Sequence, residues 1–478
     1  MPDMASPELP VPDGLVLRPF HGVRFTVDDP AKVTSPPYDL ISDGDVQALL
    51  DLHPNNVVRL TLPRPPRHPT HPAGPGHPVG HANHHTRRPS DALETATGTL
   101  STTAPPTSDS RPAAQPIDGA AAPARYGQAR DTLRAWLDAG VLARDAEPAL
   151  YVYEQSGPGV MQRGLIGDVG LAAPEQRIIL PHEDVMPGPV ADRLALMSTT
   201  QANLEPIFLL YDGGGPATHL VDTVATTRPP LVEANTGDGV RHRLWAVTAA
   251  EEIARINADL RHRQALIADG HHRYATYRVL QRQEHAARDS DGPWDFGLAL
   301  LVDSTAYPPD LKAIHRVIPS LPLVEAVTKA RGAWQIRDFP TLDAGLAALD
   351  TAPEPAFLLA GTGETSHLLS DPDPVQLARA MPTDRSERWN SLNTSVLAEF
   401  VLPRVWGMRD DEQAVRIVHH DARAAVRQAA DAGGTAVILK PLAVEAVLAV
   451  AAEGERVPRK STSFGPKPRT GLILRTFV

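Results

Sequence analysis

The chain has 478 residues, enough for two or three domains, and its 42% hydrophobic and 22% charged content is ordinary for a soluble globular protein. A formal net charge of −11 argues against a general nucleic-acid binder, because such proteins neutralise phosphates with positive charge. The absence of cysteine excludes disulfides, thiolate zinc sites and cysteine nucleophiles. No signal peptide or membrane-length apolar run is visible, so we expect a cytoplasmic protein without a membrane partner.

The N-terminal segment alternates between extended and turn-like sequence. Residues 1–11 are predicted to be disordered, residues 15–27 to form one or two strands, and residues 55–62, NNVVRLTL, to form another strand. Between these strands, two consecutive prolines hold the backbone extended and fix the direction of Tyr38 and Asp39. We regard both residues as substrate-binding candidates, although a plain turn into a following helix explains them equally well.

Residues 64–123 differ in composition from the rest of the chain. Pro, Ala, Thr, Ser, Gly and His dominate, and no Phe, Trp or Tyr occurs, so this stretch cannot bury enough apolar surface to offset its ordering entropy. We predict a disordered insertion. The irregular spacing of its histidines does not favour a physiological metal site, although they could bind stray metal. These histidines are His68, His71, His77, His81, His84 and His85.

Order is predicted to resume at Tyr126 with an amphipathic helix. Residues 149–155 are rich in β-branched and aromatic side chains and predict a strand, with residues 163–171 as its hairpin partner. Asn203 opens the next apolar stretch and is a further substrate-binding candidate. Additional strands are expected at residues 203–211 and 240–247.

The stretch LPHEDVMPGPVADRL (180–194) gathers polar residues that its prolines keep out of a simple solvated helix. His182 beside Glu183 suits general-base chemistry or Mg²⁺ binding, so both are catalytic candidates. Arg193 is a candidate phosphate ligand. A polar loop followed by a helix with Asp192 as its N-cap is an equally good interpretation.

The most informative stretch is QALIADGHHRYATYRVL (264–280), in which Ala265–Ala268 fits a buried strand, Asp269 and Gly270 end it, and a helical pattern follows. A strand that feeds a helix in this way leaves the N–H groups and partial positive charge of the helix start open to an anion such as phosphate. Successive helical residues are about 100° apart, so the two adjacent histidines fan outward. Asp269 could be a simple N-cap with solvated neighbours, but the whole cluster behind a buried strand favours a phosphate site with Gly270, His271, His272 and Arg273.

The core is predicted to end with an apolar strand at residues 296–302 and a further strand in which Arg316 follows His315, a histidine that is interpreted as structural. Residues 321–478 are predicted to form an additional α/β region. It ends in VPRKSTSFGPKPRTG (457–471), whose prolines and glycines exclude a regular helix. Cations and hydroxyls in a stiff loop suit a phosphate cradle that returns to the site, with a basic disordered tail as the rival interpretation; the candidates are Lys460, Ser461, Thr462 and Lys467.

Eight motifs of the sequence resemble the bacterial and archaeal family named domain of unknown function 1015. They span nearly the whole chain apart from the insertion. The sequence departs from the family pattern at Val190, where lysine is usual, and at Gly465, where an aromatic residue is usual. The matching motifs are SPPYDLI (35–41), HPNNVVRL (53–60), ALYVYEQ (149–155), LPHEDVMPGPVADRL (180–194), ANLEPIF (202–208), VRHRLW (240–245), IADGHHRYAT (267–276) and PRKSTSFGPKPRTGL (458–472).

The DGHHR corner is also similar to that of the ParB/sulfiredoxin-like superfamily, which includes free-serine kinases. This resemblance implies an α+β fold, a ParB/sulfiredoxin-like mixed core assembled from residues 12–63 and 124–320. It further implies ATP and Mg²⁺ as cofactors, Asp269 as the general base, and phosphate contacts from His271, His272 and Arg273. Sulfiredoxin chemistry needs a cysteine, and ParB-type DNA partitioning disagrees with the acidic charge, so neither applies.

The expected activity is ATP-dependent phosphoryl transfer to a small hydroxylated metabolite, with free L-serine as the first guess. A metal-assisted phosphohydrolase that uses His182, Glu183, Asp269 and His271 remains open, as does a non-catalytic nucleotide-sensing module. The expected partners are a small-molecule substrate and a nucleotide. We also expect Asp269, Arg273, Glu183 and Lys460 to converge on one cleft.

Overall fold

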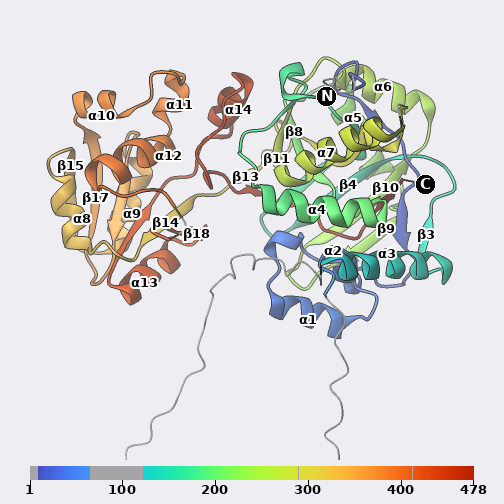
Figure 1. The fold of residues 1–478 in the computed structure, drawn as a ribbon, viewed down its shortest axis with the longest axis horizontal. Helices are drawn as coiled ribbons and strands as arrows, with labels where there is room; N and C mark the ends of the chain where they lie inside the picture. Colours follow the sequence, from blue (N-terminus) through green and yellow to red (C-terminus); the bar gives the residue numbers. More distant parts are fainter. Residues whose placement is uncertain (1–8, 65–121, 289, 412, 478) are drawn as a thin grey trace, which may run out of the picture.

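The computed structural model describes residues 9–64, 122–288, 290–411 and 413–477, which form two lobes (Figure 1). The segments predicted to be disordered at 1–11 and 64–123, with the six histidines of the insertion, lie almost entirely outside the described residues. The larger lobe is built on a nine-stranded sheet and the smaller lobe on a six-stranded sheet. None of the helices in the described ranges is both long and apolar enough to cross a lipid bilayer.

The sheet of the larger lobe is mixed. Its strand order is β6-β11-β8-β12-β5-β4-β10-β9, with β1 beside β5. β8 runs parallel to β12 and antiparallel to β11, while β4 and β5 form the predicted hairpin. The strands are β1 (Leu17–Arg18), β4 (Leu150–Gly157), β5 (Val160–Gly170), β6 (Ile179–Leu180), β8 (Ile207–Tyr211), β9 (Val232–Asn235), β10 (Arg241–Val247), β11 (Ala265–Asp269) and β12 (Phe296–Asp303).

Both faces of this sheet are covered, which explains why β8 and residues Ala265–Ala268 of β11 are apolar at every position. In β11, Ala265 and Ile267 belong to one hydrophobic cluster, and Leu266 and Ala268 belong to another, because successive strand residues point to opposite faces. The first cluster includes residues of α5 (Pro216–Thr227), α6 (Ala250–Leu260) and α7 (His271–Arg288). The second includes residues of α14 (Val444–Ala452) and of the C-terminal segment, among them Phe464, Leu472 and Ile473.

The structure corrects the prediction for residues 55–62, which lie in a further layer of the larger lobe. Residues 55–62 were expected to form a strand, but the structure has the short helix α2 (Val58–Thr61) there. Asn56 is the physical reason: its Nδ2 donates to the carbonyls of Lys32 (2.9 Å) and Thr34 (3.0 Å), and its Oδ1 accepts from Val58 N (3.0 Å). A side chain that captures the local backbone in this way competes with strand pairing.

The second correction concerns α4 (Pro187–Thr200), which begins five residues before Asp192. Proline is favoured in the first turn of a helix because its missing N–H group has no partner there anyway. Asp192 therefore lies inside the helix, where its carboxylate binds Arg125 and Arg193, and the N-cap interpretation is wrong. The layer around α4 also contains α1 (Asp43–Leu52), α3 (Ala122–Asp138), β2 (Val23–Phe25) and β3 (Leu142–Arg144).

The smaller lobe has the strand order β15-β17-β16-β19-β14-β18. β14 pairs with both β18 and β19, so it lies in this second sheet although its residues precede the predicted boundary at 320. The strands are β14 (Ile314–Ile318), β15 (Trp334–Phe339), β16 (Phe357–Ala360), β17 (Ser366–Pro372), β18 (Arg416–His419) and β19 (Thr435–Ile438). The helices are α8 (Leu323–Ala330), α9 (Leu342–Thr351), α10 (Pro374–Ala380), α11 (Glu387–Ser391), α12 (Asn393–Val396), a π-helix (Leu397–Val405) and α13 (Ala422–Ala432).

After the second lobe, the chain returns to the first. β20 (Phe464–Gly465) pairs with β13 (Asp310–Leu311), and β21 (Arg475–Thr476) pairs with β7 (Ala202–Asn203). Single backbone bridges join Thr470 to Ser35 and Leu474 to Val23. The loop at 457–471 is therefore held between ordered strands, next to the start of α7.

Candidate active site at the start of helix α7

The corner between β11 and α7 depends on Gly270. This residue has φ of +93°, a left-handed conformation that favours glycine. A Cβ placed there would lie 3.0 Å from the Ile207 side chain and 3.2 Å from the Arg273 guanidinium. Tyr274 N donates to Gly270 O (2.9 Å), so the N–H groups of the three preceding residues lie outside the hydrogen-bond ladder of the helix.

Asp269 stands at the centre of a chain of charges. Its Oδ2 lies 2.7 Å from Arg273 Nη2 and its Oδ1 lies 2.5 Å from Lys467 Nζ. The same lysine nitrogen lies 2.5 Å from Asp39 Oδ2. Burial raises the pKa of Asp269, but Lys467 and Arg273 outweigh burial and hold that pKa below its ordinary value. Asp269 is therefore ionised at neutral pH.

The pKa of Lys467 is set by the same contacts. Burial lowers this pKa, but the carboxylates of Asp269 and Asp39 outweigh burial and raise the pKa above its ordinary value. Lys467 therefore stays charged. One ammonium group holds the SPPYD segment and the DGHHR corner together.

A second hydrogen-bonded group joins the HED and KST segments. The hydroxyl Oγ1 of Thr462 lies 2.8 Å from His182 Nε2 and donates to Glu183 Oε1 (2.8 Å). Since a hydroxyl has one proton, Nε2 of His182 must carry the hydrogen that Thr462 accepts. His182 is completely buried, and burial together with the neighbouring His271 lowers its pKa to about 3. The histidine is therefore neutral and orients Thr462.

The two histidines of the corner have different surroundings. The ring of His271 packs edge-on against His182 with 4.6 Å between centroids, and burial and the charge of His272 lower the pKa of His271 to about 3. Nε2 of His272 accepts from Met186 N (3.0 Å). Burial lowers the pKa of His272 and Lys460 lowers it further, while Glu183 and Asp269 oppose this change.

These electrostatic contacts place the predicted residues relative to one another. The pKa of His272 is shifted by the charges of Lys460, Glu183, Asp269 and Arg273. The segments that carry these residues therefore meet around the start of α7. Ser461 belongs to the same loop, and its Oγ donates to Pro458 O (2.6 Å).

Both arginines of the predicted site lie inside the protein. Arg273 is 6% exposed and its Nη1 donates to Pro206 O (2.7 Å), whereas Arg193 is 8% exposed and donates to Asp192 and to Thr61 O (2.9 Å). The ring of Tyr38 packs on both guanidiniums, 4.5 Å from that of Arg193 and 5.9 Å from that of Arg273. Lys460 and Lys467 are thus the partly exposed cations among the predicted phosphate ligands.

Asn203, expected to contact substrate, is buried in a structural position. Its Oδ1 accepts from Arg475 Nη1 (3.0 Å) and Leu298 N (3.2 Å), so it fastens the C-terminal strand to β12.

Glu205 is a residue of this region that sequence reasoning missed. It is buried, and its Oε1 accepts from Tyr38 N (3.1 Å) and Thr470 Oγ1 (2.8 Å). The signal was a glutamate followed by proline at the head of the apolar run IFLLY.

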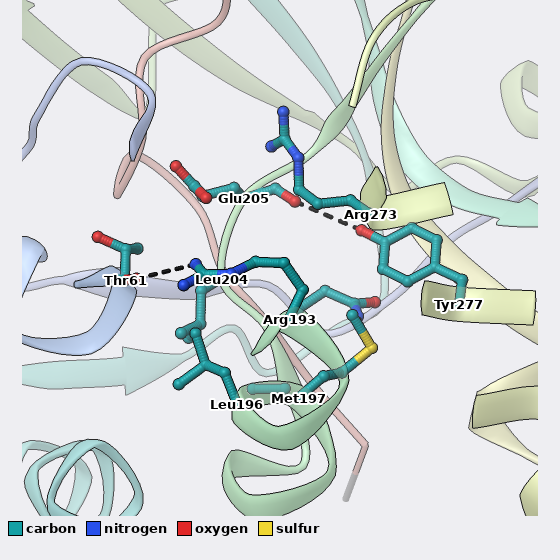
Figure 2. Close-up of a pocket in the computed structure, with 10 residues that line it drawn as sticks. Thr61, Arg193, Leu196, Met197, Leu204, Glu205, Arg273 and Tyr277 are labelled. Carbon is teal, nitrogen blue, oxygen red and sulfur yellow. Dashed lines mark hydrogen bonds between the residues drawn. The ribbon is translucent and has the colours of Figure 1, made fainter. Parts of the chain in front are cut away.

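A cavity of about 30 Å³ lies behind the corner (Figure 2). Arg193, Arg273, Glu205 and Tyr277 line it together with apolar side chains from α4. Its volume accommodates about two water molecules and excludes a nucleotide. Thr61 Oγ1 and Arg273 Nε are buried without a hydrogen-bond partner among the described residues. Water molecules in the cavity would provide hydrogen-bond partners for both atoms. Of the four residues expected to converge on one cleft, only Arg273 lines this cavity.

The carboxylates at the corner suit Mg²⁺ when phosphates supply its other ligands. Among the described residues, the group of three histidine or carboxylate side chains close enough to share an ion is His285, Asp291 and Asp295, at the other end of α7. At the corner itself, Lys467 sits between Asp39 and Asp269. Mg²⁺ is commonly held by one or two carboxylates when phosphates supply further ligands, so Asp39, the more exposed of the two carboxylates, fits an ion that arrives with a nucleotide.

The buried histidines predict how stability depends on pH. The pKa values of His182 and His271 are about 3 in the folded chain, against an ordinary value of 6.5. Between these values the unfolded chain binds protons that the folded chain does not, so stability falls as the pH drops below 6.5 and is unaffected well above it. We expect each of these histidines to lower the free energy of unfolding by about 2 kcal/mol between pH 7 and pH 5.

Urea unfolding at the two pH values measures this loss. His242 and His315, with pKa values of about 4, contribute in the same direction. His271→Gln should reduce the pH-dependent loss by about 2 kcal/mol, while His219→Gln, at an exposed position, should not change it. An unchanged pH dependence in His271→Gln would show that this ring binds its proton as readily in the folded chain as in the unfolded chain.

Three solved structures are similar to part of the chain. A free serine kinase in complex with AMP has a TM-score of 0.31 and 14% identity, over 62% of this chain and 88% of that chain. A conserved hypothetical protein from Pyrococcus furiosus has the same TM-score and identity, over 62% of this chain and 90% of that chain. SbnI with a C-terminal truncation, from Staphylococcus aureus, has a TM-score of 0.33 and 11% identity, over 64% and 85%. Scores at this level carry no inference about ligands or activity.

Comparison by sequence is more specific. No curated protein matches the chain. The family model described as protein of unknown function (DUF1015) matches residues 17–86 and 110–395, which is most of the chain, and confirms the resemblance seen in the motifs. The chain therefore belongs to the DUF1015 family of proteins of unknown function.

Proposed function

We propose that this protein is an ATP-dependent phosphotransferase that acts on a small hydroxylated metabolite, with free L-serine as the first candidate. The observation that supports the proposal is the cluster of charges at the start of α7, where Asp269 and Asp39 share Lys467 and Lys460 lies near His272. Phosphoryl transfer requires neutralised phosphates, a positioned acceptor and a base for its hydroxyl. Side chains for all three tasks are present in this cluster.

The phosphates are assigned to the outer side of the corner. The backbone N–H groups of His271 and His272, which precede the helical ladder, would donate to phosphate oxygens, as helix starts commonly do. Lys460 and Lys467 would add positive charge from the C-terminal loop. Ser461 and Thr462 of the same loop would complete the cradle.

Asp269 is the proposed general base. Its carboxylate is ionised and held by two cations, so it has a fixed direction. In protein kinases an aspartate likewise accepts the proton of the substrate hydroxyl. Glu183 is the second candidate, with Thr462 and the neutral His182 orienting it.

The remaining predicted residues have supporting roles in this proposal. Arg273 and Arg193 act from inside, where they hold Asp269 and the ring of Tyr38 in place. Tyr38 and Asp39 would face the acceptor, whereas Asn203 supports the site through Arg475. Mg²⁺, when bound with ATP, would neutralise charge on the phosphates, and Asp39 would hold it.

The metal-assisted phosphohydrolase has less support. It would need His182, Glu183, Asp269 and His271 as metal ligands, and these four side chains are not a group of close ligand atoms among the described residues. Both histidines are also buried and hydrogen-bonded or packed within the protein. A nucleotide-sensing module without turnover is the alternative that an activity measurement separates from the kinase.

The direct test is incubation of the protein with γ-labelled ATP, Mg²⁺ and a panel of amino and hydroxy acids. We expect label to appear in one class of hydroxylated acceptor and ATP consumption to depend on that acceptor. Thermal stabilisation by ATP without transfer to any acceptor would favour the sensing module. If neither transfer to any acceptor nor stabilisation by ATP occurred, the proposal would be refuted.

A further inference from the structure

The second lobe contributes a buried arginine to the loop that carries Lys460. Arg316 lies in β14, at the centre of the three neighbouring strands β19, β14 and β18, and is 1% exposed. Its guanidinium leaves the sheet and reaches the KST segment: Nη2 donates to the carbonyls of Lys460 (3.0 Å) and Arg459 (3.2 Å). Its Nη1 donates to Ile314 O (3.1 Å).

The two carbonyls bound by Nη2 flank the Cα of Lys460. Their convergence on one nitrogen fixes the backbone of that residue, which has φ of +55°, a left-handed conformation that is rare for a lysine. Such a conformation is disfavoured and persists where neighbouring contacts impose it. The hydrogen bonds of Arg316 are therefore a physical reason why Lys460 is held in this conformation.

The second lobe holds the same loop at another point. Nε2 of His420, just after β18, lies 2.7 Å from Ser463 Oγ, and Lys312 N donates to Ser463 O (3.1 Å). Between these anchors, Thr462 is bound by His182 and Glu183 of the first lobe. The loop is thus fastened alternately to the two lobes.

Burying the charged side chain of Arg316 inside a sheet lowers the stability of the fold. Its hydrogen bonds go to the carbonyls of Ile314, Arg459 and Lys460, and its Nε has no partner among the described residues. Burial lowers its pKa to about 10, against the opposing effect of Asp410. An apolar side chain of similar length usually fills such a position at lower cost in stability, so the packing of β14 does not explain an arginine here.

We infer that Arg316 is a positioning residue through which the second lobe sets the place of Lys460 beside the start of α7, and thereby the affinity for a polyphosphate. The affinity part of this inference rests on the proposed function, whereas the positioning of the loop does not. Two measurements keep them separate.

The first measurement is hydrogen exchange, in the ligand-free protein, of the amides that flank this loop: Val457 N, which donates to His182 O (2.9 Å), and those of β20. Arg316→Met and Arg316→Lys should each raise the exchange rate of these amides by about tenfold or more, because hydrogen bonds from a charged group are lost or weakened. Arg423→Lys is the matched control, since Arg423 lies in the same lobe but pairs with Asp343 at the surface. Unchanged protection in folded Arg316→Lys would overturn the inference.

The second measurement is a double-mutant cycle for binding of ATP with Mg²⁺. Arg316→Lys should weaken binding by about tenfold, and this effect should shrink to less than about twofold in the Lys460→Ala background, because coupled residues are not additive. An equal loss in both backgrounds would contradict an action through Lys460. If the wild-type protein bound no ATP, the proposed function would fail, and the exchange measurement would still decide whether Arg316 positions the loop.

Discussion

Asp269→Asn is expected to lower the rate of phosphoryl transfer by about a hundredfold to ten-thousandfold, the range typical of a general base. The amide is nearly the same size as the carboxylate, but it cannot accept the proton of the acceptor hydroxyl. Affinity for ATP should not fall, because the change removes a negative charge from the neighbourhood of the phosphates. Single-turnover transfer of labelled phosphate and an ATP titration measure the two quantities separately.

Asp145→Asn provides the matched control for this variant. Asp145 is buried to a similar degree, at 17% side-chain exposure against 16% for Asp269, and also pairs with an arginine, Arg24. It lies outside the cluster at α7. We expect this control to lose some stability and to keep its transfer rate at temperatures well below unfolding. A normal transfer rate in Asp269→Asn would move the role of base to Glu183.

Lys467→Met should affect both affinity and pH dependence. Loss of a charged hydrogen-bond donor to phosphate should weaken ATP binding by about tenfold to a hundredfold. Lys467 is also the main electrostatic influence that lowers the pKa of Asp269, so its removal leaves only Arg273 to oppose burial, and that pKa rises. The base then becomes protonated at a higher pH, and the acid limb of the profile of kcat/KM against pH moves upward.

Two further variants separate these effects. Lys467→Arg retains the charge and should keep the acid limb in place, although the longer side chain weakens binding. Lys460→Met should weaken ATP binding without moving the acid limb, because Lys460 does not pair with Asp269. An acid limb that stays in place in Lys467→Met would mean that Asp269 is not the group whose ionisation controls the rate.

The sequence predicted those elements whose pattern is local. The strand at 265–268 and the helix after it are present as β11 and α7, because a short apolar run bounded by Asp-Gly is typical of a buried strand. The hairpin of β4 and β5 is present for a similar reason. The mixed sheet as a whole agrees with the expected mixture of helices and strands, while the exact topology was not readable from patterns.

The features that could not be predicted from the sequence depend on contacts between distant parts of the chain. Residues 55–62 alternate like a strand, but the side chain of Asn56 bonds to Lys32 and Thr34 and turns the backbone into α2. The inward direction of Arg273 follows from the Pro206 carbonyl, which no periodicity of α7 reveals. The pairing of β14 with β18 and β19 likewise joins segments far apart in sequence.

The return of the chain to its first lobe has a consequence for biosynthesis. Asp269 and its helix emerge from the ribosome before the whole second lobe, and Lys467 follows only after that lobe. Until then the carboxylate lacks the lysine that binds it, and β7 lacks its partner strand β21. A nascent chain halted within the second lobe would therefore carry an incomplete charge cluster, so this cluster would be completed only late in translation.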